Sequence, residues 1–121
     1  MQLQLSVMAA YQKAGSLLRV SVSGSYGPFM ITRQASMAFL SITLIRLAKF
    51  TSSGPVYVTT VIESNIPVGI ERNGTLTRDG EPAGPLLFSK KISSANMKNA
   101  LVKVDLQKNN KLITSETVHL K

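Results

Sequence analysis

The sequence contains no cysteine and a single histidine, His119. Without Cys the chain has no disulfide, no thiol nucleophile and no Cys-ligated zinc or iron–sulfur site. One His cannot build a common transition-metal site unaided, and its place in an alternating segment near the C-terminus indicates a solvated or structural residue. The sequence therefore predicts no metal site and no cofactor.

Recognisable catalytic groups are missing as well. The six acidic residues are scattered along the chain, so they suggest no pair for general acid–base chemistry. The segment Gly24-Ser25-Tyr26-Gly27 is not a phosphate-binding loop, because no Gly-Lys-Ser/Thr follows it. We expect a protein that is not an enzyme.

Long apolar runs are also absent. The longest uncharged apolar stretch, residues 34–45, has 12 residues, whereas a membrane-spanning helix needs about 20. Residues 1–10 lack the basic start and long apolar core of a signal peptide. We expect neither a spanning helix nor a secretion signal.

Acidic residues are rare and unevenly placed. Fourteen Lys and Arg stand against six Asp and Glu, for a net charge of +8. Residues 1–62 hold five basic residues and no acid, residues 63–81 hold four acids and two Arg, and residues 82–121 hold seven Lys and two acids. This balance favours anionic partners, either nucleic-acid phosphates or an acidic membrane. The alternative is that the charge only keeps the protein soluble.

A chain of 121 residues suits one domain, residues 1–121, around one core. Alternating apolar and polar residues predict a β-hairpin over 3–22, a strand over 56–62 that breaks at Pro67, and a second hairpin over 101–120. Turns are predicted at 51–55, at Asn73-Gly74 and at Asp79-Gly80. Residues 66–84 form either a short strand at 75–78 between two turns or one mobile loop.

A principal helix is predicted after Thr32, whose hydroxyl can cap it. Ile31, Ala35, Ala38 and Phe39 recur at helical spacing and make an apolar stripe. The helix either continues to Phe50 or changes to a strand near residue 41, and the β-branched residues of 41–45 favour the change. Ser93 or Ser94 can cap a short second helix through 96–100.

These elements predict an α+β fold. It consists of a mostly antiparallel twisted sheet with one principal helix packed on it, a short second helix and a C-terminal β-hairpin.

The candidate binding surface is a set of lysines near the C-terminus that can share one face. Its members are Lys90, Lys91, Lys98, Lys103, Lys108 and Lys111. The ammonium group of Lys is a point charge, which suits attraction to a negatively charged surface. It suits less well the recognition of one particular group through two parallel hydrogen bonds. Among aromatic residues only Phe88 is close, which argues against base stacking, so lipid head groups and nucleic-acid phosphates both stay open. The alternative is a solvated, Lys-rich sheet edge that prevents aggregation.

Several strings of the chain resemble, in order, the matrix proteins of rhabdoviruses, the vesiculovirus type in particular. They are Val20-Ser21-Val22-Ser23, then Gly27-Pro28-Phe29 with 32–39, then Arg46 to Ser53, then Ala83 to Phe88, then Ser93-Ser94, Ala100-Leu101 and the closing hairpin to Lys121. The likeness is one of pattern and covers most of the chain from Val20 onward. The chain departs from that family in having no Pro-Pro-x-Tyr or Pro-Thr/Ser-Ala-Pro string and no loop between Leu40 and Thr43.

The resemblance implies a viral matrix-type structural protein. Such a protein binds anionic membrane and the viral nucleocapsid, and it self-associates in virion assembly and budding. Its partners would be an anionic membrane surface, viral ribonucleoprotein or other nucleic acid, and further copies of itself, with no small-molecule substrate. It would lie at the inner face of the virion envelope, in the host cytoplasm and on the cytoplasmic face of membranes. The alternatives are a small basic nucleic-acid-binding protein and a non-enzymatic protein-interaction or assembly domain.

Overall fold

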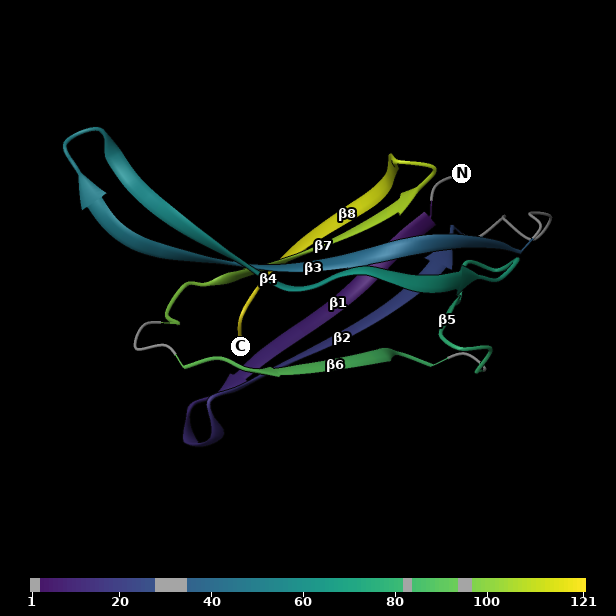
Figure 1. The fold of residues 1–121 in the computed structure, drawn as a ribbon, viewed down its shortest axis with the longest axis horizontal. Coiled ribbons are helices and arrows are strands. Elements are labelled where there is room, and N and C mark those ends of the chain that lie inside the picture. Colours follow the sequence, from purple (N-terminus) through teal and green to yellow (C-terminus); the bar gives the residue numbers. More distant parts are fainter. Residues whose placement is uncertain (1–2, 28–34, 82–83, 94–96) are drawn as a thin grey trace.

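The computed structural model describes residues 3–27, 35–81, 84–93 and 97–121, which form two antiparallel β-sheets (Figure 1). A single turn of 3-10 helix, η1 (Lys13–Gly15), lies between the first two strands. The strands of this part of the chain are β1 (Leu3–Gln12), β2 (Leu17–Tyr26), β3 (Ser36–Thr51), β4 (Gly54–Ile70), β5 (Leu76–Thr77), β6 (Leu86–Lys91), β7 (Leu101–Lys108) and β8 (Lys111–His119).

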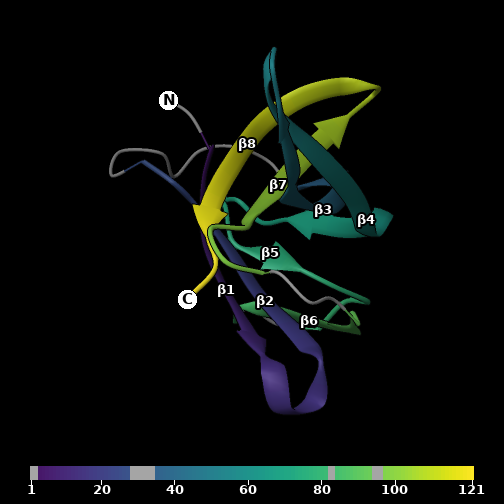
Figure 2. The same ribbon diagram turned by 90° about the vertical axis from the view of Figure 1, so that its left-hand side faces the viewer.

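One sheet has three strands in the order β1-β2-β6, and the other has five in the order β5-β4-β3-β7-β8. Figure 2 shows β1, β2 and β6 on one side of the molecule and β3, β4, β7 and β8 on the other. The arrangement is a two-layered β-fold, with the core between the layers.

The first hairpin is confirmed, and the alternation along β1 explains why it forms. Leu3, Leu5, Val7 and Ala9 are buried while the residues between them are exposed. β1 pairs with β2 in unbroken register, from Leu3 opposite Tyr26 to Gln12 opposite Leu17. Since side chains alternate between the two faces of a strand, this register places every buried residue of β1 on the core side.

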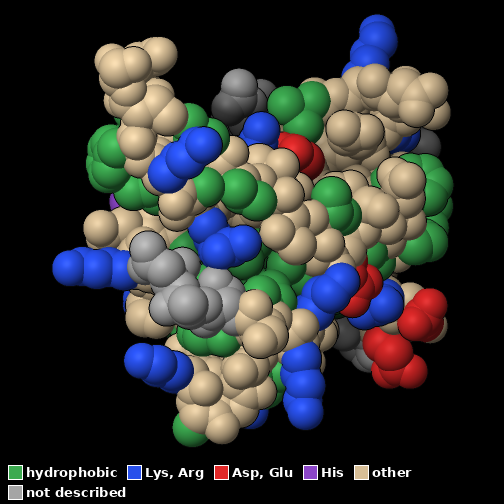
Figure 3. All heavy atoms as spheres, turned by 60° about the vertical axis from the view of Figure 1, so that its left-hand side comes forward, with side chains coloured by type: hydrophobic (Ala, Val, Ile, Leu, Met, Phe, Trp, Pro, Cys, Tyr) green, Lys and Arg blue, Asp and Glu red, His purple; other side chains and the backbone are tan. Residues whose placement is uncertain are grey.

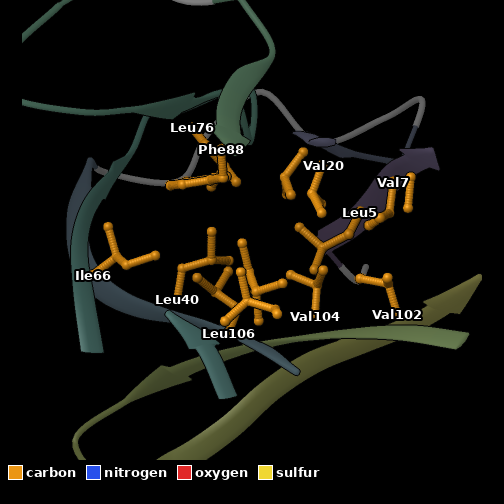
Figure 4. Close-up of a cluster of buried hydrophobic side chains, with 14 of the residues drawn as sticks. Leu5, Val7, Val20, Leu40, Ile66, Leu76, Phe88, Val102, Val104 and Leu106 are labelled. Atoms are coloured by element: carbon orange, nitrogen blue, oxygen red, sulfur yellow. The ribbon is translucent and has the colours of Figure 1, made fainter. Parts of the chain in front are cut away.

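The core is made by facing residues of the two sheets (Figure 4). Both sheets contribute fully buried side chains, and Phe88 of β6 and Leu76 of β5 extend the cluster. Among the residues with no exposed surface are Leu18, Val22, Leu40, Ile42, Leu44, Leu76, Val102, Val104 and Leu106. Apolar burial of this kind is the main stabilising contribution to the fold.

Two backbone hydrogen bonds join the sheets at separate places. The amide of Tyr26, at the end of β2, donates to the carbonyl of Asn73 at 2.9 Å. The amide of Lys121 donates to the carbonyl of Ala9 in β1 at 3.1 Å. The C-terminal segment after β8 therefore lies along the free edge of β1.

The predicted α+β fold is wrong, because the described residues are almost entirely strand. In place of the principal helix, Ser36–Thr51 is one strand of 16 residues, with neighbours β4 and β7. Apolar residues also recur here with period two: Ala38, Leu40 and Ile42 all face the core, whereas Phe39 of the predicted stripe lies on the other face. The predicted start of the helix, Ile31 and Thr32, lies outside the described residues.

The short second helix is also not found in the part of the chain that is described. Residues 97–100 form a turn in which the amide of Ala100 donates to the carbonyl of Met97 at 3.2 Å. Residues 94–96, which include one predicted cap, lie outside the described residues. The expectation of one sheet is likewise replaced by two.

The predicted strand over 56–62 is confirmed, but it does not break at Pro67. β4 continues to Ile70, and Pro67 lies opposite Phe39 of β3. At Pro67 the described part of the sheet offers β4 a neighbour on one side only, so a residue without an amide hydrogen is tolerated there.

For residues 66–84 the strand alternative is correct over the described part. β5 lies between two turns whose glycines have positive φ, 87° at Gly74 and 74° at Gly80. The C-terminal hairpin is confirmed by the pairing of β7 with β8. Its turn residues Asn109 and Asn110 have φ of 52° and 62°, as a two-residue hairpin turn requires.

Candidate anion-binding surface

In the described part of the chain no polar or charged residue is buried. No group of three or more His, Asp or Glu side chains there could hold a metal ion. No helix in that part is long and apolar enough to cross a membrane.

Five segments lie toward one side of the molecule, which we call the basic end: residues 11–19, 45–60, 89–93, 97–101 and 117–121. Within it the β1–β2 turn and the turn between β3 and β4 point away from each other (Figure 1). Figure 1 shows them toward its left side, where β1 turns into β2, β6 ends and β7 begins. In these segments lie Lys13, Arg19, Arg46, Lys49, Lys90, Lys91, Lys98 and Lys121.

Hydrogen bonds and strand pairs bring these segments together. The amide of Ile92 donates to the carbonyl of Ser16 at 2.7 Å, and the Tyr11 hydroxyl donates to the carbonyl of Ile92 at 2.6 Å. The amide of Leu120 donates to the carbonyl of Ala100 at 3.0 Å. Leu101 lies between Ile45 of β3 and His119 of β8. These contacts fix the backbone positions of the segments, and the side chains decide where each charge lies.

The basic end contains no acidic residue. All six acids of the chain lie in other segments: Glu63, Glu71, Asp79, Glu81, Asp105 and Glu116. Figure 3, which turns the left side of Figure 1 toward the viewer, shows Lys and Arg spread over the face and Asp and Glu gathered mainly at its right side. The protein is therefore electrically polar, with eight cations at one end.

The six lysines of the predicted surface do not share one face. Lys90, Lys91 and Lys98 belong to the basic end. Lys108 and Lys111 flank the β7–β8 turn at the other end of the eight-residue strand β7, about 23 Å away at 3.3 Å per residue. Lys103 lies between them on the outer face of the five-stranded sheet, opposite Thr43 and Thr117.

Lys90 differs from its neighbour Lys91 in direction. It lies opposite the buried Leu18, and its Nζ donates to the carbonyl of Ile62 in β4 at 3.4 Å. Lys91 lies opposite Leu17 and points to the other face of the sheet. Lys90 thus links the two sheets, while Lys91 is available to a partner.

Five cations of the basic end were missed by the sequence prediction: Lys13, Arg19, Arg46, Lys49 and Lys121. Four of them lie in the stretch 1–62, which has no acid, and that absence was the available signal. The pattern of the sequence does not show that the β1–β2 turn and the end of β6 meet. That meeting depends on pairing between β2 and β6 over about 70 residues of chain.

A two-stranded hairpin projects from the basic end (Figure 1). β3 pairs with β7 only as far as Ile45, so residues 46–51 of β3 pair with β4 alone. The strands join at the two-residue turn of Ser52 and Ser53. Beside it Gly54, the first residue of β4, has φ of 119°, and the Thr51 hydroxyl donates to the carbonyl of Gly54 at 3.0 Å. We call residues 46–60 the projecting hairpin.

The three-stranded sheet carries a hollow of about 390 Å³ next to the basic end. Met8, Ser21 and Leu87 lie in one row across β1, β2 and β6. Arg19 and Lys121 also line the hollow. Apolar and cationic side chains in one hollow suit an anionic amphiphile.

Comparison with known proteins gives no relative: no family model, no curated protein and no solved structure matches this chain.

Proposed function

We propose that the protein is a non-enzymatic structural protein of the viral matrix type, which binds anionic membrane surfaces through its basic end. The observation that carries the proposal is the separation of charge, with eight cations and no acid in the five segments of that end. A surface of one sign attracts a surface of the opposite sign and orients the protein upon it.

The strength of this attraction is sufficient for reversible membrane binding. A Lys or Arg close to an acidic bilayer contributes about 1 kcal/mol. If half of the eight cations reach the head groups at once, the total is roughly 4 kcal/mol at physiological ionic strength. Binding of this kind depends on salt, because ions screen charges beyond about 8 Å at 0.15 M.

The mixed hollow supports a membrane over a free polyanion. Beside Arg19 and Lys121 it offers the aliphatic side chains Met8 and Leu87, which suit acyl chains and provide no ring for base stacking. The exposed rings of Phe50 and Tyr57 suit either partner, since nucleic-acid binding without sequence preference also uses aromatic residues among cations.

The remaining parts of the proposed matrix role rest on the resemblance to rhabdovirus matrix proteins. They are nucleocapsid binding, self-association, budding, and location at the inner face of an envelope or the cytoplasmic face of host membranes. The described part of the helix on which the resemblance partly rests is a strand, so the proposal depends on the surface and less on that likeness.

Co-sedimentation with lipid vesicles tests the proposal. The wild-type protein should sediment with phosphatidylcholine vesicles that contain phosphatidylserine and remain in solution with phosphatidylcholine alone. If the protein does not sediment with anionic vesicles at low salt, the proposal is wrong. Preference for RNA over anionic vesicles at equal salt would favour a nucleic-acid-binding protein instead.

A further inference from the structure

Both faces of the projecting hairpin expose apolar side chains, but only one of them carries cations. Cross-strand partners share a face, so the pairs Leu47–Tyr57 and Phe50–Pro55 stand on one side. The pairs Arg46–Val58 and Lys49–Val56 stand on the other. The first face joins Ile45 and Val61 on the outer side of the five-stranded sheet and forms an apolar face.

This apolar face is open to solvent. Phe50 is 73% exposed, and Tyr57 and Val61 are each 57% exposed. A group of large exposed apolar side chains on one face is uncommon in a protein without a partner there and marks an interaction surface. It carries the aromatic residues Phe and Tyr, and amphipathic rings such as Tyr favour membrane–water interfaces.

Charge decides between two occupants of the apolar face. A second copy packed on the apolar face would bring a second basic end, with eight cations, toward the first, and residues 46–60 contain no acid to offset the repulsion. An anionic bilayer offers hydrocarbon to the apolar face and phosphates to the cations. Lys49 can reach those phosphates from the opposite face by extending its long stem.

We propose that the projecting hairpin lies in the head-group layer of an anionic membrane and places Phe50, Tyr57 and Leu47 at the edge of the acyl chains. This proposal rests on the proposed function, since the basic end brings the hairpin to the bilayer. It adds an apolar contribution to an attraction that is otherwise electrostatic.

The depth of insertion is limited by the backbone. Within the described residues, the outer edges of the hairpin strands pair with no further strand. Unpaired backbone groups cost several kcal/mol each in hydrocarbon, so the hairpin cannot cross the bilayer as a single pair of strands. It lies flat and shallow, as interfacial amphipathic elements do.

The test uses the absence of tryptophan from the chain. In the variant Phe50→Trp the indole is a single reporter at an exposed position, so the fold should be kept. On phosphatidylserine vesicles its emission should shift to the blue and be quenched by lipids brominated close to the head group. The matched control is Leu112→Trp, at an exposed residue of β8 close to the opposite end, whose emission should stay that of an indole in water.

A second variant separates the two proposals. Phe50→Ser with Tyr57→Ser should still bind anionic vesicles at low salt through the basic end, but about tenfold more weakly, and salt should release it completely. If wild-type protein binds anionic vesicles while the Phe50→Trp emission does not shift, insertion is overturned and the proposed function stands. If wild-type protein binds no anionic vesicle, both fail. A blue shift that grows with protein concentration without lipid would assign the face to a second copy and overturn insertion.

Discussion

Gly24 of β2 lies directly against Gly74 in the turn before β5: a Cβ atom on Gly24 would stand 2.6 Å from the carbonyl oxygen of Gly74. A Cβ on Gly74 would in turn overlap backbone atoms of Ser25 and Tyr26. The backbone of the turn therefore touches the backbone of β2, and the bond from Tyr26 to Asn73 forms beside this contact. Two residues without side chains let the sheets close at the end away from the basic segments.

Substitution of Gly74 tests this closure. Gly74 and Gly80 both have positive φ, but a Cβ on Gly80 would meet nothing within 4 Å. Gly80→Ala should lower the free energy of unfolding by about 1 kcal/mol through backbone strain alone. Gly74→Ala should lower it by roughly 2 kcal/mol more, because β2 must move. Urea denaturation measures both, and equal losses would contradict the close approach.

The core between the sheets is tested at Leu40. This side chain has no exposed surface, and it packs in the cluster with Leu106 and Val104. Leu40→Ala should lower the free energy of unfolding by about 2–5 kcal/mol. Leu112→Ala, at a residue 57% exposed, should change it by less than about 0.5 kcal/mol. Similar effects of the two substitutions would contradict the assignment of β3 to the core.

The Tyr11 hydroxyl ties β1 to the residue after β6. Its 2.6 Å bond to the carbonyl of Ile92 is partly buried, so Tyr11→Phe should lower the free energy of unfolding by about 0.5–1.5 kcal/mol. Tyr57→Phe on the projecting hairpin is the matched control and should have little effect. The hydroxyl contributes nothing to the fold if thermal melts of the two variants coincide.

The projecting hairpin should open more often than the rest of β3. Its strands have only each other as neighbours, whereas residues 39–45 have β4 on one side and β7 on the other. Amide hydrogens of 46–51 that bond to β4 should therefore exchange faster than those of 40–44, as local stability is lower there. Equal protection by hydrogen exchange would show that the hairpin is covered in solution.

Local patterns predicted the two hairpins and the positive-φ turns, because short-range chemistry determines these elements. The strand favoured from residue 41 onward is confirmed, but residues 36–40 were mistaken for helix because both faces of β3 carry apolar side chains: Leu40 faces the core, while Met37 and Phe39 lie on the outer face. Such a stretch fits a period of 3.6 as well as one of two. The neighbours β4 and β7 decide the outcome, and pairing with β7 spans about 60 residues of chain.

The charges of the candidate surface could be counted from the sequence, but their grouping could not. Lys91 and Lys98 were predicted to join Lys108 and Lys111 on one face, yet β7 separates the two pairs. The segments that hold Lys13 and Lys49, far away in sequence, lie toward the same side of the molecule as the end of β6, which holds Lys91. Strand order brings these residues together, and the order follows from packing that no local pattern contains.

Charge reversal at the two ends tests the central claim most directly. Lys91→Glu with Lys98→Glu changes the basic end, and Lys108→Glu with Lys111→Glu changes exposed lysines at the opposite end by the same net charge. Binding to phosphatidylserine vesicles should fall roughly 30-fold or more for the first pair, at about 1 kcal/mol for each cation lost, and less than about threefold for the second. Equal losses for the two pairs, or a larger loss for the second, would contradict a membrane-binding basic end.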